Sequence, residues 1–256
     1  MTQSANQTGR ARIRQPWIDL FLDPGDTCRA GLWLPELVLL GSSDQRAHAV
    51  GTVSWVQDAS SWRYDHPNEG QPLSFASAVD PLPSGWLLEL TFRNQSEETF
   101  SHVVGTVCLQ LPASGGFEDP DWTRTHYRSG DEFLTYAGQA CGGGEDTYRM
   151  SLVKGRDQIE RTARHKKKWG FTEQNSDDGI FAVASEDDES VITTTWQTVH
   201  HLQANNKPAF RCIHSNPYFG TLEPGVSKTV LGCVLITHGS LEEAWAETAD
   251  VIQPIE

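Results

Sequence analysis

The apolar residues of this chain come in short runs rich in β-branched and aromatic side chains, separated by Gly, Pro, Asn and Asp. Such runs are typical of β-strands, and no internal repeat of fixed length accompanies them. The sequence therefore predicts an all-β fold, a large antiparallel β-sandwich. The expected strands are residues 33–40, 49–57, 86–93, 102–111, 147–153, 179–184, 190–198, 209–214 and 227–237.

Residues 86–93 alternate apolar and polar side chains, which is typical of a strand with one face in water. The next run, 102–111, follows a turn-rich link that begins at Asn94. We expect the two runs to be neighbours in one antiparallel sheet.

One short helix is predicted near the C-terminus. Ser240 can cap it, Glu243 follows three residues later as in a capping box, and an apolar stripe runs from Leu241 to Ile252. We expect this helix to pack against the end of the sandwich.

The first fourteen residues are polar and basic, so 1–14 are predicted to be a disordered tail. The remaining residues, 15–256, are enough for one large β domain, and we expect a single β-sandwich domain.

The charge of the chain excludes some partners. It has 34 Asp plus Glu against 20 Lys plus Arg, a formal net charge of -14 that repels phosphate backbones and anionic membranes. We expect no nucleic acid and no membrane partner, and we interpret the basic cluster 161–168 as a solvated face.

Five cysteines without a CxxC pair do not indicate a disulfide framework. The N-terminus lacks the apolar stretch of a secretory signal, and no run approaches the ~18 apolar residues of a membrane span. The expectation is a cytoplasmic protein.

The segment from Cys212 to Gly220 carries the densest set of reactive groups. If 210–214 is a strand, Phe210, Cys212 and His214 share one face, Arg211 lies on the other, and a turn with recognition residues follows. If 190–200 is also one strand, Trp196 and His200 share a face.

Aromatic rings flanked by amide, guanidinium and imidazole groups suit a sugar, which offers C–H faces for stacking and hydroxyls for hydrogen bonds. The loop 117–131 is a candidate for the opposite wall of a cleft. The predicted binding residues are Trp196, His200, Asn205, Arg211, Asn216, Arg124 and His126.

The candidate for proton transfer is His214, with Tyr218 or His201 as its partner and Arg211 as a clamp for an anionic group. Such a pair can open a sugar hemiacetal or eliminate from a uronic acid. The residue types do not choose between these reactions.

A metal site is an alternative that uses the same atoms. Cys212 and His214 share a strand face, and His200, His201, His102 or His126 could complete a zinc-type site. CxH is a short motif and no HExxH or CxxC accompanies it, so we expect no metal and no cofactor.

Several C-terminal segments together resemble the terminal half of galactose-mutarotase-like β-sandwich proteins. The resemblance covers about a quarter of the chain and rests on residues 177–185, Trp196, the segment from Cys212 to Gly220, the Pro-Gly turn at Pro224 and the strand that contains Gly232. It implies a sandwich with a short terminal helix and a sugar-like ligand. The family includes sugar epimerases, and related sandwiches occur in polysaccharide lyases.

The resulting hypothesis is a carbohydrate-active protein that binds a sugar or sugar acid on a concave sheet face, with acid-base chemistry of epimerase or lyase type. The first alternative is a non-catalytic carbohydrate-binding or assembly domain, and the second is a metal-dependent enzyme with His and Cys ligands. A homo-oligomer is compatible with the sequence.

Overall fold

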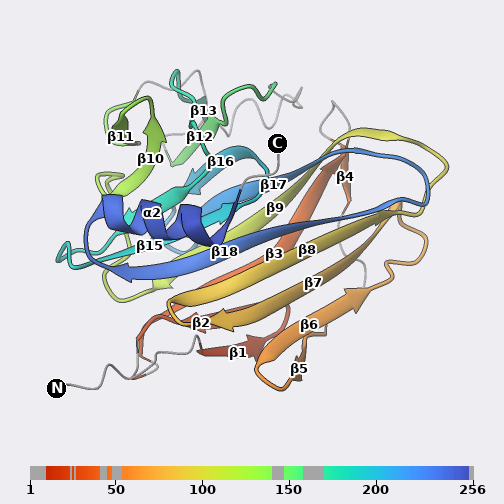
Figure 1. Ribbon diagram of the computed structural model, residues 1–256, viewed down its shortest axis with the longest axis horizontal. Helices are drawn as coiled ribbons and strands as arrows, with labels where there is room; N and C mark the ends of the chain where they lie inside the picture. The colour runs from red at the N-terminus through yellow and green to blue at the C-terminus, as the bar shows by residue number, and fades with distance from the viewer. Residues whose placement is uncertain are drawn as a thin grey trace.

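The computed structural model describes residues 10–23, 25, 27–40, 45–47, 54–139, 147–157 and 170–253. Within them the chain forms two nine-stranded sheets that pack face to face, with one helix near the C-terminus (Figure 1). The predicted all-β sandwich with a short C-terminal helix is confirmed.

Sheet A carries the candidate site. In spatial order its strands are β1 (Arg10–Arg14), β2 (Trp17–Phe21), β3 (Arg29–Leu40), β9 (Phe100–Ala113), β17 (Cys212–Leu222), β16 (Val199–Asn205), β12 (Tyr148–Leu152) and β13 (Gly170–Phe171), with β4 (Gln45–Ala47) paired to β3. Apart from the parallel pair β12 and β13, its neighbours run antiparallel.

Sheet B forms the second layer. Its strands, in spatial order, are β11 (Glu132–Thr135), β10 (Thr125–Ser129), β14 (Phe181–Ala184), β15 (Ser190–Trp196), β18 (Ser227–His238), β8 (Gly85–Asn94), β7 (Leu73–Leu82), β6 (Ser61–His66) and β5 (Val56–Asp58).

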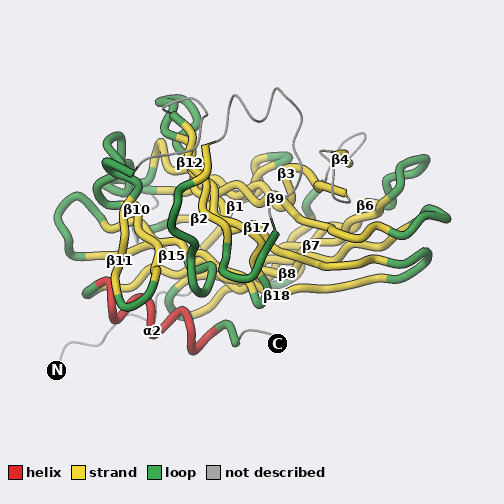
Figure 2. Tube along the Cα trace, turned by 90° about the horizontal axis from the view of Figure 1, so that it is seen from above, coloured by secondary structure: helices red, strands yellow, loops and turns green. Residues whose placement is uncertain are grey.

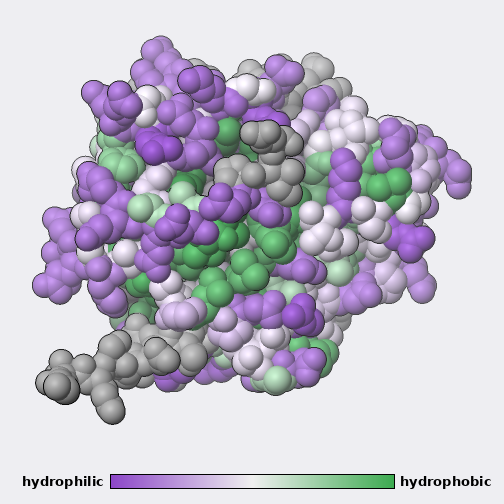
Figure 3. All heavy atoms as spheres, in the orientation of Figure 1, coloured by the Kyte–Doolittle hydropathy of each residue, from purple (hydrophilic) through white to green (hydrophobic). Residues whose placement is uncertain are grey.

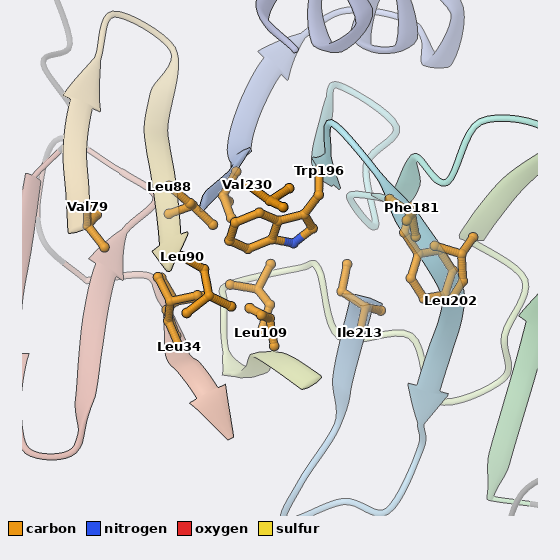
Figure 4. Close-up of a cluster of buried hydrophobic side chains, with 14 of the residues drawn as sticks. Leu34, Val79, Leu88, Leu90, Leu109, Phe181, Trp196, Leu202, Ile213 and Val230 are labelled. Carbon is orange, nitrogen blue, oxygen red and sulfur yellow. The ribbon is translucent and has the colours of Figure 1, made fainter. Parts of the chain in front are cut away.

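The core lies between the sheets, because each strand turns every second side chain toward the other layer. Figure 4 shows Leu88 and Leu90 of sheet B pointing toward Leu109 and Ile213 of sheet A, with the Trp196 indole among them. All five side chains are buried. Burial of this apolar surface is the main stabilising contribution to the two-layer arrangement.

The helix α2 (Leu241–Val251) packs on the outer face of sheet B, beside β15 and β18, rather than against the end of the sandwich (Figure 2). Ser240 and Glu243 form the predicted capping box. Thr248 anchors the helix through a 2.6 Å hydrogen bond to Thr193. Figure 3 shows hydrophobic residues gathered in the middle of this face, where β8, β18 and α2 meet.

The predicted disordered tail 1–14 is wrong for residues 10–14, which form the edge strand β1. Its pairing with β2 is supported by Asp19, whose buried carboxylate lies 2.7 Å from Arg14, 3.4 Å from Arg12 and 3.6 Å from Arg29. The basic residues read as signs of a tail therefore neutralise a buried charge. Residues 1–9 lie outside the described part.

The predicted pairing of runs 86–93 and 102–111 is also wrong. β8 lies in sheet B and β9 in sheet A, so the link after Asn94 crosses between the layers. The buried Asn94 amide donates to the carbonyl groups of Glu98 (2.7 Å) and Leu222 (3.0 Å), which joins the crossing to the end of β17.

Residues 190–200 do not form one strand. The Gln197 N–H donates to Leu231 of sheet B (2.8 Å), whereas the Thr198 carbonyl accepts from Tyr218 of sheet A (2.9 Å). The chain changes layer between these two residues, because each satisfies its backbone in a different sheet.

Two expectations fall wholly or partly outside the described residues: the basic cluster 161–168 and much of the expected strand 49–57. Among the helices that are described, none is both long and apolar enough to cross a membrane.

Candidate functional site

Strand β17 builds the candidate site on the face of sheet A that points away from the core. Ile213 packs into the core, while Cys212 and His214 face the opposite side together with Phe210, as the period-2 pattern predicts. The expected turn after His214 is wrong: β17 continues to Leu222.

The neighbouring strand β16 places a second row of polar residues beside the first. Its register sets Asn205 opposite Cys212, Gln203 opposite His214, and His201 opposite Asn216. Six of the predicted site residues therefore lie on two adjacent strands: His200, His201, Asn205, His214, Asn216 and Tyr218.

A cavity of about 290 Å³ opens above these strands. Its polar lining is supplied mainly by β3, β9, β16 and β17. Its aromatic residues come from β2 (Trp17), β3 (Trp33), β12 (Tyr148) and the turn before β17 (Phe210). The described lining residues are Trp17, Trp33, Glu36, Cys108, Gln110, Tyr148, Gln203, Asn205, Phe210, Cys212 and His214. We call this space the aromatic cavity.

Two thiols and an imidazole form one wall of the aromatic cavity. Cys212 Sγ lies 3.0 Å from His214 Nε2, and Cys108 Sγ lies within 4.8 Å of both atoms. The hydrogen bond from Cys108, together with the His214 charge, lowers the pKa of the Cys212 thiol despite its burial. Burial and the neighbouring Cys212 raise the pKa of the Cys108 thiol. The pair therefore favours one thiol and one thiolate.

The aromatic walls come from separate parts of the chain. Trp17 and Trp33 are in contact, with ring centroids 4.8 Å apart, and the Lys207 ammonium lies 5.0 Å from the centroid of Tyr148. Phe210, in the turn before β17, is 55% exposed at the rim. Phe210 is exposed, Trp17 and Trp33 are partly exposed, and Tyr148 is buried. An accessible aromatic face can stack on the apolar face of a sugar ring while the neighbouring amide groups hydrogen-bond its hydroxyls.

Next to the aromatic cavity, His201 is held in a fixed orientation. The Asn216 carboxamide accepts from the Val107 N–H (3.3 Å), so its NH₂ group donates to His201 Nε2 (2.9 Å). The proton of a neutral His201 then sits on Nδ1 and points to Nδ1 of His200, 2.9 Å away. His201 is fully buried, so it positions its neighbours instead of meeting a ligand directly.

Tyr218 belongs to the same face but farther along β17. Its hydroxyl lies 3.0 Å from His102 Nδ1, its ring centroid lies 5.4 Å from that of His200, and the Arg156 guanidinium lies 4.5 Å above it. It is not among the residues that line the aromatic cavity. Tyr218 therefore contacts His102, His200 and Arg156, and it is not placed as the predicted partner of His214.

Trp196 is not a stacking surface. Only 2% of the side chain is exposed, and the indole lies in the core among Leu88, Val230 and Leu109 (Figure 4). The prediction was wrong because β15 belongs to sheet B, which places this face of the strand inside the sandwich.

Arg211 is not available as an anion clamp, because its guanidinium pairs with Glu118 at 2.5 Å. Arg124 is used inside the protein as well, where it donates to the carbonyl groups of Gly116 (2.9 Å), Ala184 (2.5 Å) and Glu118 (2.6 Å). His126 lies on β10 of sheet B. The loop 117–131 thus does not supply the opposite wall of the cavity.

Among the lining residues that were not predicted, Cys108 and Glu36 carry recognisable sequence signals, whereas the contact of Trp17 with Trp33 carries none. Cys108 was interpreted as a small hydrophobe, yet His102, Thr106, Cys108 and Gln110 share one face of the expected strand by the same period-2 rule. Glu36 is the one carboxylate inside an otherwise apolar strand. Burying an unpaired carboxylate costs free energy, so its presence indicates that this face of the strand borders a site. Trp17 and Trp33 become neighbours only through the pairing of β2 with β3.

Comparisons with known proteins give no sequence-level relative. No protein-family model matches the chain, and no curated protein sequence matches it.

Solved structures give similarities in overall arrangement at low sequence identity. A proposed aldose 1-epimerase from Escherichia coli K12 is 11% identical, with a TM-score of 0.48 over 90% of this chain and 99% of that one. A galactose mutarotase related enzyme from Lactobacillus acidophilus is 10% identical, with a TM-score of 0.46 over 91% and 98%. A polysaccharide lyase is 13% identical, with a TM-score of 0.45 over 93% of this chain and 34% of that one.

The sequence predicted a resemblance to galactose-mutarotase-like proteins in the C-terminal part alone, and this prediction was too narrow. The structural similarity to such proteins spans about 90% of the chain, across both sheets of the sandwich.

Proposed function

We propose that this protein binds a neutral monosaccharide in the aromatic cavity and catalyses proton transfer at its hemiacetal centre, a reaction of mutarotase or epimerase type. The observation that carries the proposal is the composition of the cavity wall: four aromatic side chains, three amides, a carboxylate and an imidazole around about 290 Å³. A pyranose ring needs both stacking faces and hydrogen-bonding groups.

The charges at the cavity favour a neutral sugar over a sugar acid. The described lining includes Glu36 and no Lys or Arg, and Arg211, the expected clamp, pairs with Glu118. A uronate carboxylate entering this space would meet the Glu36 carboxylate among the lining residues, whereas the Lys207 and Arg14 cations stack on the Tyr148 and Trp17 rings. This argues against the lyase branch of the hypothesis, which requires a neutralised uronate.

Glu36 and His214 supply the two proton-exchanging groups. In ring opening, the Glu36 carboxylate takes the proton from the hydroxyl on the anomeric carbon while the protonated His214 imidazole donates to the ring oxygen. The bond between the anomeric carbon and the ring oxygen breaks, giving the open-chain aldehyde. Rotation about the bond to the next carbon and the reverse proton transfers then close the ring with the other configuration.

The test is magnetisation exchange between α and β anomeric protons, measured by NMR on a panel of neutral aldoses. We expect accelerated exchange for at least one sugar, and a loss of about 100- to 10,000-fold in Glu36→Gln and His214→Ala. The controls are Glu242→Gln and His238→Ala, two exposed residues near the helix on sheet B, which should exchange like the wild type.

Sugar binding without exchange would identify the protein as the non-catalytic carbohydrate-binding alternative. Neither binding nor exchange across the panel would reject the proposal. Exchange that persists in His214→Ala would remove this residue from the reaction.

A further inference from the structure

Cys108, Cys212 and His214 form the one group of three potential metal ligands found among the described residues. They come from two adjacent strands: β17 supplies Cys212 and His214 on the same face, and the register that pairs Cys212 with Gln110 and Ile213 with Leu109 continues to bring Cys108 opposite His214. The sheet, not a loop, fixes this arrangement.

The ligand atoms have nearly the spacing that a tetrahedral ion requires. Zinc lies ~2.3 Å from thiolate sulfur and ~2.0–2.1 Å from imidazole nitrogen, so ligand atoms in a tetrahedral site are roughly 3.5–3.8 Å apart. Here Cys212 Sγ and His214 Nε2 are 3.0 Å apart and no pair among the three atoms exceeds 4.8 Å. Small side-chain rotations are enough to place an ion between them.

The burial and charge of the cluster also favour a cation. The exposed fractions are 3% for Cys108, 7% for Cys212 and 3% for His214, yet all three residues line the aromatic cavity. Two thiolates next to each other in a buried wall are costly, whereas a divalent ion would neutralise both. Two thiolates and an imidazole form a soft donor set, which suits zinc and not magnesium or calcium.

We propose that Cys108, Cys212 and His214 form a three-ligand site for a thiophilic divalent cation of the zinc type, with its fourth coordination position open to the aromatic cavity. Three protein ligands and one exchangeable position are typical of zinc sites that meet a ligand. This inference does not depend on the sugar proposal. Both proposals use the His214 imidazole, so a cation bound at His214 competes with its role as a proton donor.

Titration of the chelator-treated full-length protein with Co²⁺ tests the site, because thiolate-to-cobalt charge transfer gives an absorption band that oxygen-only sites lack. We expect one equivalent to bind with this band, and zinc to displace it. Cys108→Ser and Cys212→Ser should each weaken binding by at least about 10- to 100-fold and reduce the band. Cys28→Ser, which alters a half-buried cysteine outside the cluster, is the matched control and should bind like the wild type.

Circular dichroism and thermal unfolding of each metal-free variant separate loss of ligand from loss of fold. A wild-type protein without the band, or a band of full strength in both cluster variants, overturns the site, and so does a band lost in Cys28→Ser. Anomeric exchange is measured separately on metal-free protein, so failure of the metal site and failure of the sugar reaction give different results.

Discussion

At the residue scale, the site combines a pattern that is visible in the sequence with contacts that are not. Period-2 alternation is enough to place Cys212 and His214 on one face, because side-chain direction along a strand is a local property. The partners of these residues depend on strand pairing. Cys108 and Glu36 lie far from residue 212 in sequence, and only the order β3, β9, β17 brings them to the same cavity.

Phe210 offers a residue-scale test of sugar binding. Its ring is 55% exposed at the rim of the aromatic cavity, so Phe210→Ala removes a stacking face without opening the core. We expect the free energy of sugar binding to weaken by about 1 kcal/mol, which is a roughly fivefold loss of affinity measured by calorimetry. The free energy of unfolding should change little.

The matched control for that variant is Val56→Ala, since Val56 is a 63% exposed apolar residue on the edge strand β5 of the other sheet. It should leave affinity unchanged. Equal affinities in all three proteins would contradict a stacking role for Phe210.

His126 gives a residue-scale prediction on pH and stability. Burial lowers the pKa of its imidazole below the ordinary value of 6.5, so the folded protein resists the proton that the unfolded chain accepts. The unfolded state then binds more protons than the native state, and stability falls as pH drops below 6.5 toward the folded pKa.

Urea unfolding at several pH values measures the effect, and His126→Gln should show a smaller loss of stability between neutral and mildly acidic pH than the wild type. His238→Gln, at an exposed histidine, is the control and should follow the wild-type curve. If His126→Gln lost as much stability on acidification as the wild type, the effect would not come from His126.

At the element scale, strands such as β8, β9 and β18 were predicted, whereas β6, β7, β10 and β16 were not, and neither was the distribution of the strands between the two sheets. Runs of β-branched and aromatic residues identify strands by local composition. Several links cross between the layers. The one after Asn94 carries the same kind of turn residues as an ordinary hairpin, and the one at Gln197 to Thr198 carries no Gly, Pro, Asn or Asp. Long-range hydrogen bonds, such as that from the Asn94 amide to the Leu222 carbonyl, fix which sheet the chain enters after the link. The sequence around the link does not reveal these bonds.

Gly232 shows how closely two strands of sheet B pack, because Trp196 of β15 lies directly opposite it. A Cβ at position 232 would overlap the Trp196 ring and come within 2.6 Å of the Thr195 carbonyl oxygen. Gly232→Ala should therefore lower the free energy of unfolding by about 1–3 kcal/mol through overpacking.

Chemical denaturation compares this variant with Ser227→Ala, a substitution at the exposed start of the same strand. The Ser227 variant should unfold like the wild type. A Gly232→Ala protein of unchanged stability would mean that β15 and β18 can separate locally at no cost, contrary to the packing described.

At the scale of the whole molecule, the net negative charge of the chain and the Glu36 carboxylate in the cavity both disfavour binding of an anionic ligand. The net charge of -14 sets a long-range negative field, and Glu36 adds a local one. An added ligand carboxylate ~8 Å from Glu36 would cost about 2 kcal/mol at an effective dielectric constant of ~20.

A neutral hexose should therefore bind at least about tenfold more tightly than its uronic acid counterpart at neutral pH. Calorimetry on galactose and galacturonate, or on whichever pair the exchange panel selects, measures the difference. Glu36→Gln should reduce the gap, and added salt should reduce its long-range part. Tighter binding of the uronate would contradict the proposed preference for a neutral sugar.

The central claim, that the aromatic cavity on sheet A is where a sugar reacts, is tested most directly by a crystal structure with a sugar that shows anomeric exchange. The expected density lies between Trp17, Trp33, Tyr148 and Phe210, with the anomeric carbon toward Glu36 and His214. Sugar bound elsewhere, with this cavity left empty, would contradict the account.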